Sequence, residues 1–184
     1  MCSCVYLLAF SAIGISYVSA LTTKLAGPYD LAFRRMEHCK DEGTKELGYH
    51  TKLNKVSKYE FAYNGDFKMP DTTGISIAAT VFKKMQSGQW FKIYDYFVAD
   101  ACEDVKKYLP DIFKKYTEEY LKVKPECPIA GGTYNADNWI VFFKDTPVEE
   151  LEYGEYRVVD VFQRGEERIG CVELYVGVEE KAAN

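Results

Sequence analysis

The chain has 184 residues, a formal net charge of −5 and 47% hydrophobic residues. That length is typical of one domain of ordinary size. An acidic chain is poorly suited to following phosphate backbones, so we expect no nucleic-acid partner.

Residues 1–20 contain no charged side chain and end in Val18-Ser19-Ala20. An apolar run followed by small residues is typical of a secretory signal peptide, with cleavage here before Leu21. A membrane anchor is the competing interpretation, but a span usually needs about 20 strongly apolar residues. We therefore expect a secreted, extracellular protein without stable membrane insertion, with one domain at 21–178 and a polar tail at 179–184.

The first half of the domain shows β-strand patterns of unequal strength. Residues 33–39 form a plausible first strand, and the polar stretch 40–54 is expected to be a loop. Residues 58–69 alternate with period 2, which predicts a strand buried on one face. Asn64-Gly65 could form a hairpin turn, but the alternation continues through it and favours one bent or bulged strand.

Two further strands follow. Ile75, Ile77, Ala79 and Val81 share one face of the next strand. Residues 90–98 have aromatic side chains on both faces. Such a strand is either central in a sandwich or exposes one face to a ligand or partner.

The pattern becomes helical around residues 100–124. Asp100 and Glu103 have the spacing of a helix N-cap and capping box, and Pro110 is expected to divide the segment in two. An apolar stripe recurs every three or four residues, at Val105, Tyr108, Leu109, Ile112, Phe113, Tyr116 and Tyr120. Ordinary packing against a sheet is the usual role of such a stripe, and a lid over a pocket is the functional alternative.

Strand patterns resume after Gly131 and continue to the end of the domain. Trp139, Val141 and Phe143 share one face, and residues 145–154 connect to the next strand. Two more alternating strands lie on either side of a turn at 164–167. With about seven strands and one helical insert, the chain is predicted to be mainly β, an antiparallel two-sheet sandwich.

Removing the leader leaves four cysteines, Cys39, Cys102, Cys127 and Cys171. An even number in an exported chain predicts two disulfides. Four cysteines allow three pairings, and the spacing alone does not choose among them.

The second half of the chain resembles a known family. The residues that carry the likeness are Cys127-Pro128, Gly132-Thr133-Tyr134, Asn138, Pro147, Leu151, Gly154-Glu155-Tyr156-Arg157-Val158 and Cys171. In this order they resemble the insect secreted branch of the ML lipid-recognition proteins, which includes chemosensory proteins and is similar to the ganglioside activator. Over about residues 27–178 the resemblance implies an immunoglobulin-like β-cup around an apolar cavity, with disulfides Cys39–Cys171 and Cys102–Cys127.

Catalytic and cofactor motifs have little support. His38 and His50 lie in weakly patterned stretches, and Gly74–Ala78 only loosely matches a nucleophile elbow. The sequence contains no metal-ligand spacing and no glycine-rich phosphate loop. We therefore expect a protein that is not an enzyme and has no metal or other cofactor.

The favoured hypothesis is a carrier that binds a lipid or another hydrophobic small molecule, such as a pheromone or hydrocarbon, between the sheets. A filled core uses the same residue types, and a secreted interaction protein that docks on a receptor or enzyme is the alternative. The expected cavity residues are Phe61, Tyr63, Phe67, Ile77, Val81, Trp90, Ile93, Trp139, Val141, Phe143, Tyr156, Val158, Val172 and Leu174, with Phe113 and Tyr116 closing the opening.

Overall fold

A computed structural model describes residues 29–57, 60–141 and 152–181. The expected signal peptide and Phe143 lie outside the described residues. So does most of the connecting segment expected at residues 145–154.

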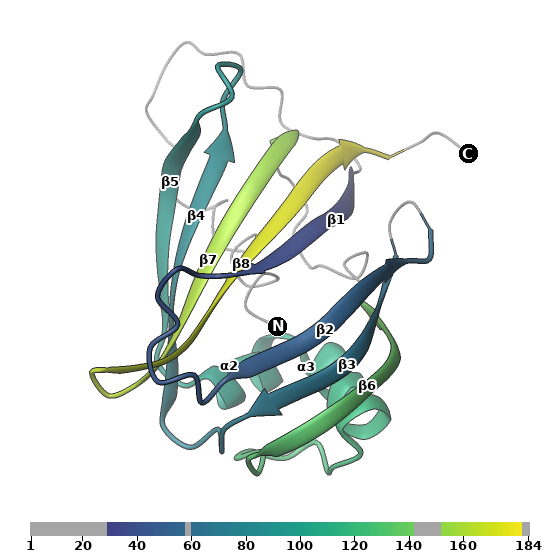
Figure 1. Cartoon of the computed structure of the whole chain (residues 1–184), viewed down its shortest axis with the longest axis vertical. Helices are drawn as coiled ribbons and strands as arrows, with labels where there is room; N and C mark the ends of the chain where they lie inside the picture. Colours follow the sequence, from purple (N-terminus) through teal and green to yellow (C-terminus); the bar gives the residue numbers. More distant parts are fainter. Residues whose placement is uncertain (1–28, 58–59, 142–151, 182–184) are drawn as a thin grey trace.

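Eight described strands form two antiparallel sheets (Figure 1). The larger sheet has the order β1-β8-β7-β4-β5, and the smaller has the order β2-β3-β6. The mainly β, two-sheet antiparallel fold that the sequence predicts is confirmed. The strand bounds are β1 Tyr29–His38, β2 Gly48–Lys55, β3 Phe61–Met69, β4 Ile75–Lys84, β5 Trp90–Val98, β6 Gly132–Val141, β7 Gly154–Arg164 and β8 Glu167–Glu180.

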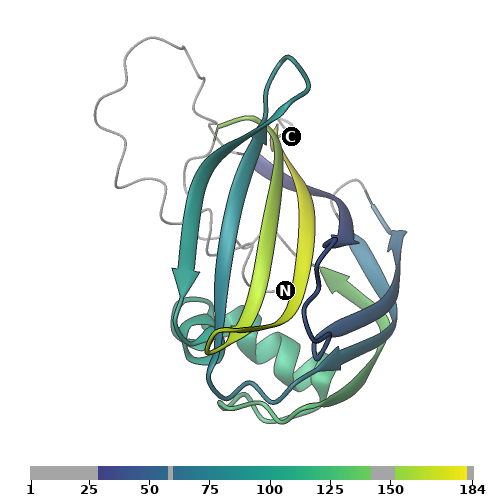
Figure 2. The ribbon, with the colours of Figure 1, turned by 60° about the vertical axis from the view of Figure 1, so that its left-hand side comes forward.

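The helical insert lies at one end of the two sheets (Figure 2). It consists of α2 (Ala101–Tyr108), α3 (Pro110–Lys115) and the π-helix η1 (Tyr116–Leu121). Pro110 begins α3, as its position in the sequence predicts. Because α2 contacts β4 and η1 contacts β6, the insert joins the two sheets. Within the described residues, no helix is long and apolar enough to cross a membrane.

The space between the sheets is filled by alternating side chains from both of them. On β4 the four residues at 75, 77, 79 and 81 are each at most 4% exposed. They belong to one hydrophobic cluster that also contains Tyr63 and Trp139 of the smaller sheet. From β8 the cluster takes Val172, Leu174, Val176 and Val178. Period-2 burial on both sheets therefore creates the core.

Strand β3 runs through Asn64-Gly65 without a hairpin. Its register with β6 shifts between Tyr63 and Gly65, and Gly65 has a φ of 130°. The Asn64 side-chain oxygen accepts a hydrogen bond from the backbone N–H of Asn138 at 3.0 Å. The register shift shows the bulged strand that the sequence pattern favours. The Asn64 bond joins the two strands at this irregularity.

Two boundaries predicted from the sequence are wrong. Strand β2 occupies the later part of the stretch expected to be a loop, from residue 48 onward, and it pairs with β3 from Gly48↔Lys68 to Lys55↔Phe61. As an edge strand with exposed polar residues, β2 has no strong apolar pattern and depends on its neighbour. The expected polar tail also starts too early, since Glu179 and Glu180 are paired within β8.

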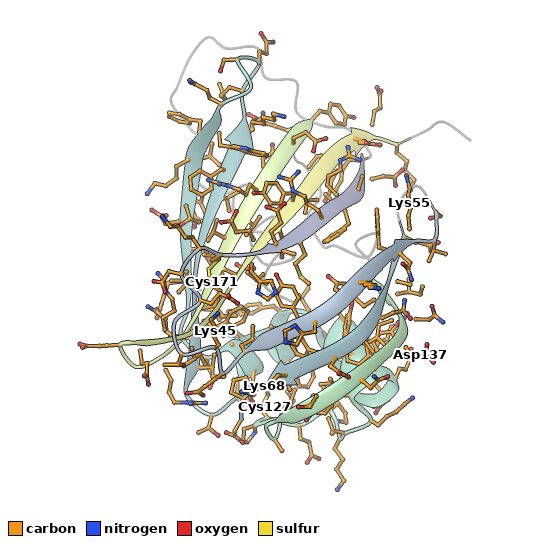
Figure 3. The ribbon with its side chains drawn as sticks, in the orientation of Figure 1. Lys45, Lys55, Lys68, Cys127, Asp137 and Cys171 are labelled. Atoms are coloured by element: carbon orange, nitrogen blue, oxygen red, sulfur yellow. A yellow bond between two sulfur atoms is a disulfide. The ribbon has the colours of Figure 1, made fainter. Side chains whose placement is uncertain are left out.

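The structure contains both disulfides that the family resemblance implies. Cys39–Cys171 joins the end of β1 to β8, with Cα atoms 5.6 Å apart. Cys102–Cys127 closes the helical insert, with Cα atoms 5.9 Å apart. Figure 3 shows them at separate places, with Cys171 near the loop that follows β1 and Cys127 at the helical end. One bridge therefore ties the two ends of the domain, and the other anchors the insert.

Candidate ligand-binding site

The larger apolar cavity lies where the helical insert meets both sheets. Its volume is about 160 Å³. The β3–β4 side contributes Phe67, Met69, Thr72, Ile75 and Ile77, the insert contributes Ala101, Cys102, Val105, Phe113, Tyr116, Thr117 and Leu121, and Leu47, Ile129, Trp139 and Phe162 complete the wall. The cavity therefore lies where elements that are distant in the sequence meet.

The helical side of the wall is positioned by local hydrogen bonds. The Asp100 side chain caps α2 by accepting from the backbone N–H groups of Cys102 at 3.1 Å and Glu103 at 3.0 Å. In η1, the Thr117 hydroxyl donates to the carbonyl oxygen of Phe113 at 2.8 Å. Thr117 is 1% exposed, and this bond allows its hydroxyl to lie in an apolar wall without a desolvation penalty.

The segment after the insert is joined directly to the β3–β4 turn. The backbone N–H of Ile129 donates to Thr72 Oγ1 at 2.8 Å, and the N–H of Thr72 donates to the Ile129 carbonyl at 3.0 Å. Cys127 lies two residues earlier and is bridged to α2. These bonds and the bridge hold both sides of the cavity together.

A second, smaller cavity of about 20 Å³ lies between the sheets. Its wall consists of Met36, Leu47, Tyr49, Tyr63, Phe67, Ala136, Trp139, Phe162 and Val172. Leu47, Phe67, Trp139 and Phe162 also line the larger cavity. The two cavities therefore adjoin and share these four wall residues.

Trp139 in the shared wall is held by Tyr120 of η1. The two rings stack with centroids 5.1 Å apart and an interplanar angle of 29°. The Tyr120 hydroxyl donates to the Ile140 carbonyl and accepts from the Ile140 N–H, both at 3.2 Å. Burial raises the pKa of Tyr120, so this hydroxyl remains a donor at neutral pH.

Seven of the expected cavity residues line one or both cavities: Tyr63, Phe67, Ile77, Phe113, Tyr116, Trp139 and Val172. Five others belong to the surrounding core without lining a cavity: Phe61, Val81, Tyr156, Val158 and Leu174. The structure does not describe the side chain of Val141, at the end of β6, or any part of Phe143.

Trp90 and Ile93 do not belong to the site. Trp90 packs edge-to-face on Tyr175, with ring centroids 5.7 Å apart, on the outer face of the larger sheet. Ile93 is 48% exposed. Strand β5 shifts register against β4 between Tyr94 and Lys92. The expectation rested on aromatic side chains on both faces of this strand, and in the structure β5 lies at the edge of the described sheet with residues 91–95 exposed.

Sequence reasoning missed several wall residues. Ile75 and Phe162 share a strand parity with residues that were expected, and Val105 lies in the predicted helical stripe. Leu47 and Tyr49 have no such signal because the polar stretch 40–54 lacks a clear period. The missed residues are Met36, Leu47, Tyr49, Met69, Thr72, Ile75, Ala101, Cys102, Val105, Thr117, Leu121, Ile129, Ala136 and Phe162.

The residues considered for catalysis are dispersed. His38 Nδ1 lies 2.7 Å from Glu42 Oε2, whereas His50 is exposed on β2. Ser76 lies within β4, paired with Gln163, and not on a strand-to-helix turn. Within the described residues no group of three His, Cys, Asp or Glu is placed to hold a metal ion. None of His38, His50 and Ser76 lines either cavity.

One buried carboxylate was not anticipated. Asp160 is 1% exposed and lies in β7 between Val158 and Phe162, paired with Ala79 and Val172. Its alternation with buried neighbours places it on the inner face of the larger sheet.

Comparisons with known proteins give likenesses among solved structures. No known protein family and no curated protein matches the sequence. Among solved structures, the chain is similar to chicken MD-1 complexed with lipid IVa, with a TM-score of 0.38 and 7% sequence identity. The match covers 82% of this chain and 97% of that chain.

Proposed function

We propose that this protein is a secreted carrier that binds a lipid or another apolar molecule between its two β-sheets. The observation that carries the proposal is the apolar cavity of about 160 Å³ walled by both sheets and the helical insert. An engineered cavity of about 150 Å³ lined by aliphatic and aromatic side chains binds benzene. The present cavity therefore suits a ring or one segment of an acyl chain.

Affinity in such a site comes from burial of apolar surface. Each buried methylene contributes about 0.8 kcal/mol, so several methylenes give useful affinity without a charged contact. Candidate ligands are fatty chains, a hydrocarbon or a pheromone. Phe113 and Tyr116 line the cavity from the insert, so the insert serves as its closing side.

The two disulfides support an extracellular role. Such bridges persist in oxidising compartments and are rare in reducing ones. Together with the predicted signal peptide, they favour export. The second half of the chain resembles the ML family. We therefore propose, as the specific form of this function, a chemosensory carrier of the ML type.

The proposal is tested by filling the cavity. Val105 is 8% exposed and lines it, so Val105→Phe should place additional ring atoms where the ligand lies. We expect the affinity for a fluorescent apolar probe, N-phenyl-1-naphthylamine, to fall about tenfold or more, which corresponds to about 1.4 kcal/mol. Probe fluorescence titration measures this change.

A matched control has the same substitution on the surface. Val56 is 57% exposed, so Val56→Phe should leave probe affinity unchanged. Trp139 lines both cavities, and in a Trp90→Phe background its emission should shift on probe binding. Equal affinity of Val105→Phe and wild type, with both folded, would refute the cavity as the binding site.

A second candidate function is docking on a receptor or enzyme through β5. Among the described strands, β5 pairs only with β4, and Phe91 and Phe97 are each 62% exposed. Exposed aromatic side chains on an edge strand are typical of interaction sites. A folded protein that binds no apolar probe, together with partner capture that depends on these two residues, would favour this function.

A further inference from the structure

Tyr49 of β2 has a buried hydroxyl group with no hydrogen-bond partner in the part of the chain that the structure describes. The residue is 6% exposed. Its ring stacks on His38, with centroids 4.0 Å apart and an interplanar angle of 6°. Native proteins pair most buried polar groups, so an unpaired hydroxyl held in this way indicates a role beyond packing.

Tyr49 lies in the wall of the smaller cavity. Leu47, Phe67 and Trp139 line both cavities and therefore lie between the smaller one and the larger one. The other tyrosine of the smaller cavity, Tyr63, already donates to Met36 Sδ at 3.5 Å. Of the described residues in this wall, Tyr49 alone has a buried side-chain polar atom without a partner.

The charges around Tyr49 restrict what it can bind. Burial raises the pKa of its hydroxyl, and the negative charges of Glu42, Glu37 and Glu173 raise it further. The hydroxyl is therefore protonated at neutral pH and available as a donor. The same carboxylates oppose an anionic group at this place, so a neutral oxygen is the acceptor that fits.

We propose that the Tyr49 hydroxyl selects ligands with a neutral oxygen, an alcohol, aldehyde, ketone or ester, by donating a hydrogen bond to it. The hydrocarbon part of the ligand occupies the larger cavity, and the oxygen reaches past Phe67 into the smaller one. This selection rests on the proposed carrier function. It distinguishes oxygenated apolar molecules from plain hydrocarbons and from ionised fatty acids.

The test compares ligands of one chain length on the secreted mature protein. Decane, decanol, methyl decanoate and decanoate displace N-phenyl-1-naphthylamine from wild type and from Tyr49→Phe. Loss of one neutral hydrogen bond should lower the affinity of decanol and methyl decanoate about three- to tenfold, and leave that of decane unchanged. Tyr94→Phe, the same change on an exposed tyrosine that lines neither cavity, should preserve the preference for the oxygenated ligands.

Stability gives an independent readout. Because Tyr49→Phe removes a hydroxyl that has no partner among the described residues, the ligand-free variant should melt at the same temperature as wild type or higher. A marked fall in melting temperature would assign the hydroxyl a structural bond and overturn the proposal.

Other outcomes separate this proposal from the carrier function. An unchanged preference for the ester in Tyr49→Phe would overturn the selection and leave the carrier intact. An equal loss for decanoate would overturn the restriction to neutral ligands. A folded wild type that binds neither the probe nor any of the four ligands would refute both.

Discussion

At the scale of single residues, Gly43 and Gly74 have the same backbone conformation in different surroundings. Their φ angles are 66° and 64°. A Cβ on Gly43 would lie 2.0 Å from the carbonyl oxygen of Arg168, whereas one on Gly74 would meet nothing within 4 Å. That carbonyl also accepts from the N–H of Thr44 at 3.0 Å, so the contact at Gly43 cannot relax easily.

We expect Gly43→Ala to reduce the free energy of unfolding much more than Gly74→Ala. An alanine at positive φ costs about 1 kcal/mol from strain alone, which is the loss expected at Gly74. At Gly43 the backbone collision should raise the loss to about 3 kcal/mol or more. Urea unfolding of both variants measures the difference. Similar losses would show that the β1–β2 loop moves freely away from Arg168.

The residue scale also shows a limit of sequence reasoning. Phe67 and Trp139 were expected in the cavity because each shares a strand parity with other apolar residues. Tyr49 lies between Gly48 and His50, in a stretch with a weak pattern. It is buried in the hydrophobic cluster and stacks on His38 of another strand, and no local period can reveal such contacts.

At the scale of elements, strand β5 combines exposed and buried aromatic residues. Phe91 and Phe97 are each 62% exposed. Tyr96 is partly buried and packs against both hydrophobic clusters. The three side chains therefore have different roles on one strand, although their residue types are similar.

We expect Phe91→Ser and Phe97→Ser each to change the free energy of unfolding by no more than about 0.5 kcal/mol, because both are exposed. Tyr96→Ser should lower it by about 1 to 3 kcal/mol through lost packing. Chemical denaturation distinguishes them. If β5 is a docking strand, the two Phe variants lose partner capture while remaining stable. Capture that persists in the stable double variant would exclude this surface.

The helical insert was the element best predicted from sequence. Asp100 and Pro110 set its local boundaries through an N-cap and a helix start, and both effects act within one turn. Strand β2 was the element worst predicted. Its residues become a strand only through pairing with β3, so the determining contacts lie in another part of the chain.

At the scale of the whole molecule, buried tyrosines should make the protein sensitive to alkali. Burial raises the pKa of Tyr29 and of Tyr96 to about 12, compared with about 10 in an unfolded chain. A raised folded pKa favours the folded state below pH 10, and this contribution is lost as the pH rises from about 10 to 12. Solvent screening of these half-buried groups should hold each loss to about 1 kcal/mol or less at pH 11.

Urea unfolding at several pH values between 8 and about 11.5, with phenolate absorbance as a second signal, tests this sensitivity within the range set by tyrosine ionisation. Tyr96→Phe should reduce the alkaline loss of stability. A stability that stays constant across this range would show that the tyrosines ionise freely in the folded state.

The sequence by itself determined the mainly β class, the two-sheet arrangement, the helical insert and most strand faces. These features follow from local periods, caps and prolines, which act over a few residues. Only the tertiary structure decided which side chains line a cavity. A filled core and an open pocket use the same apolar residues, and the difference depends on how two sheets and an insert meet in space.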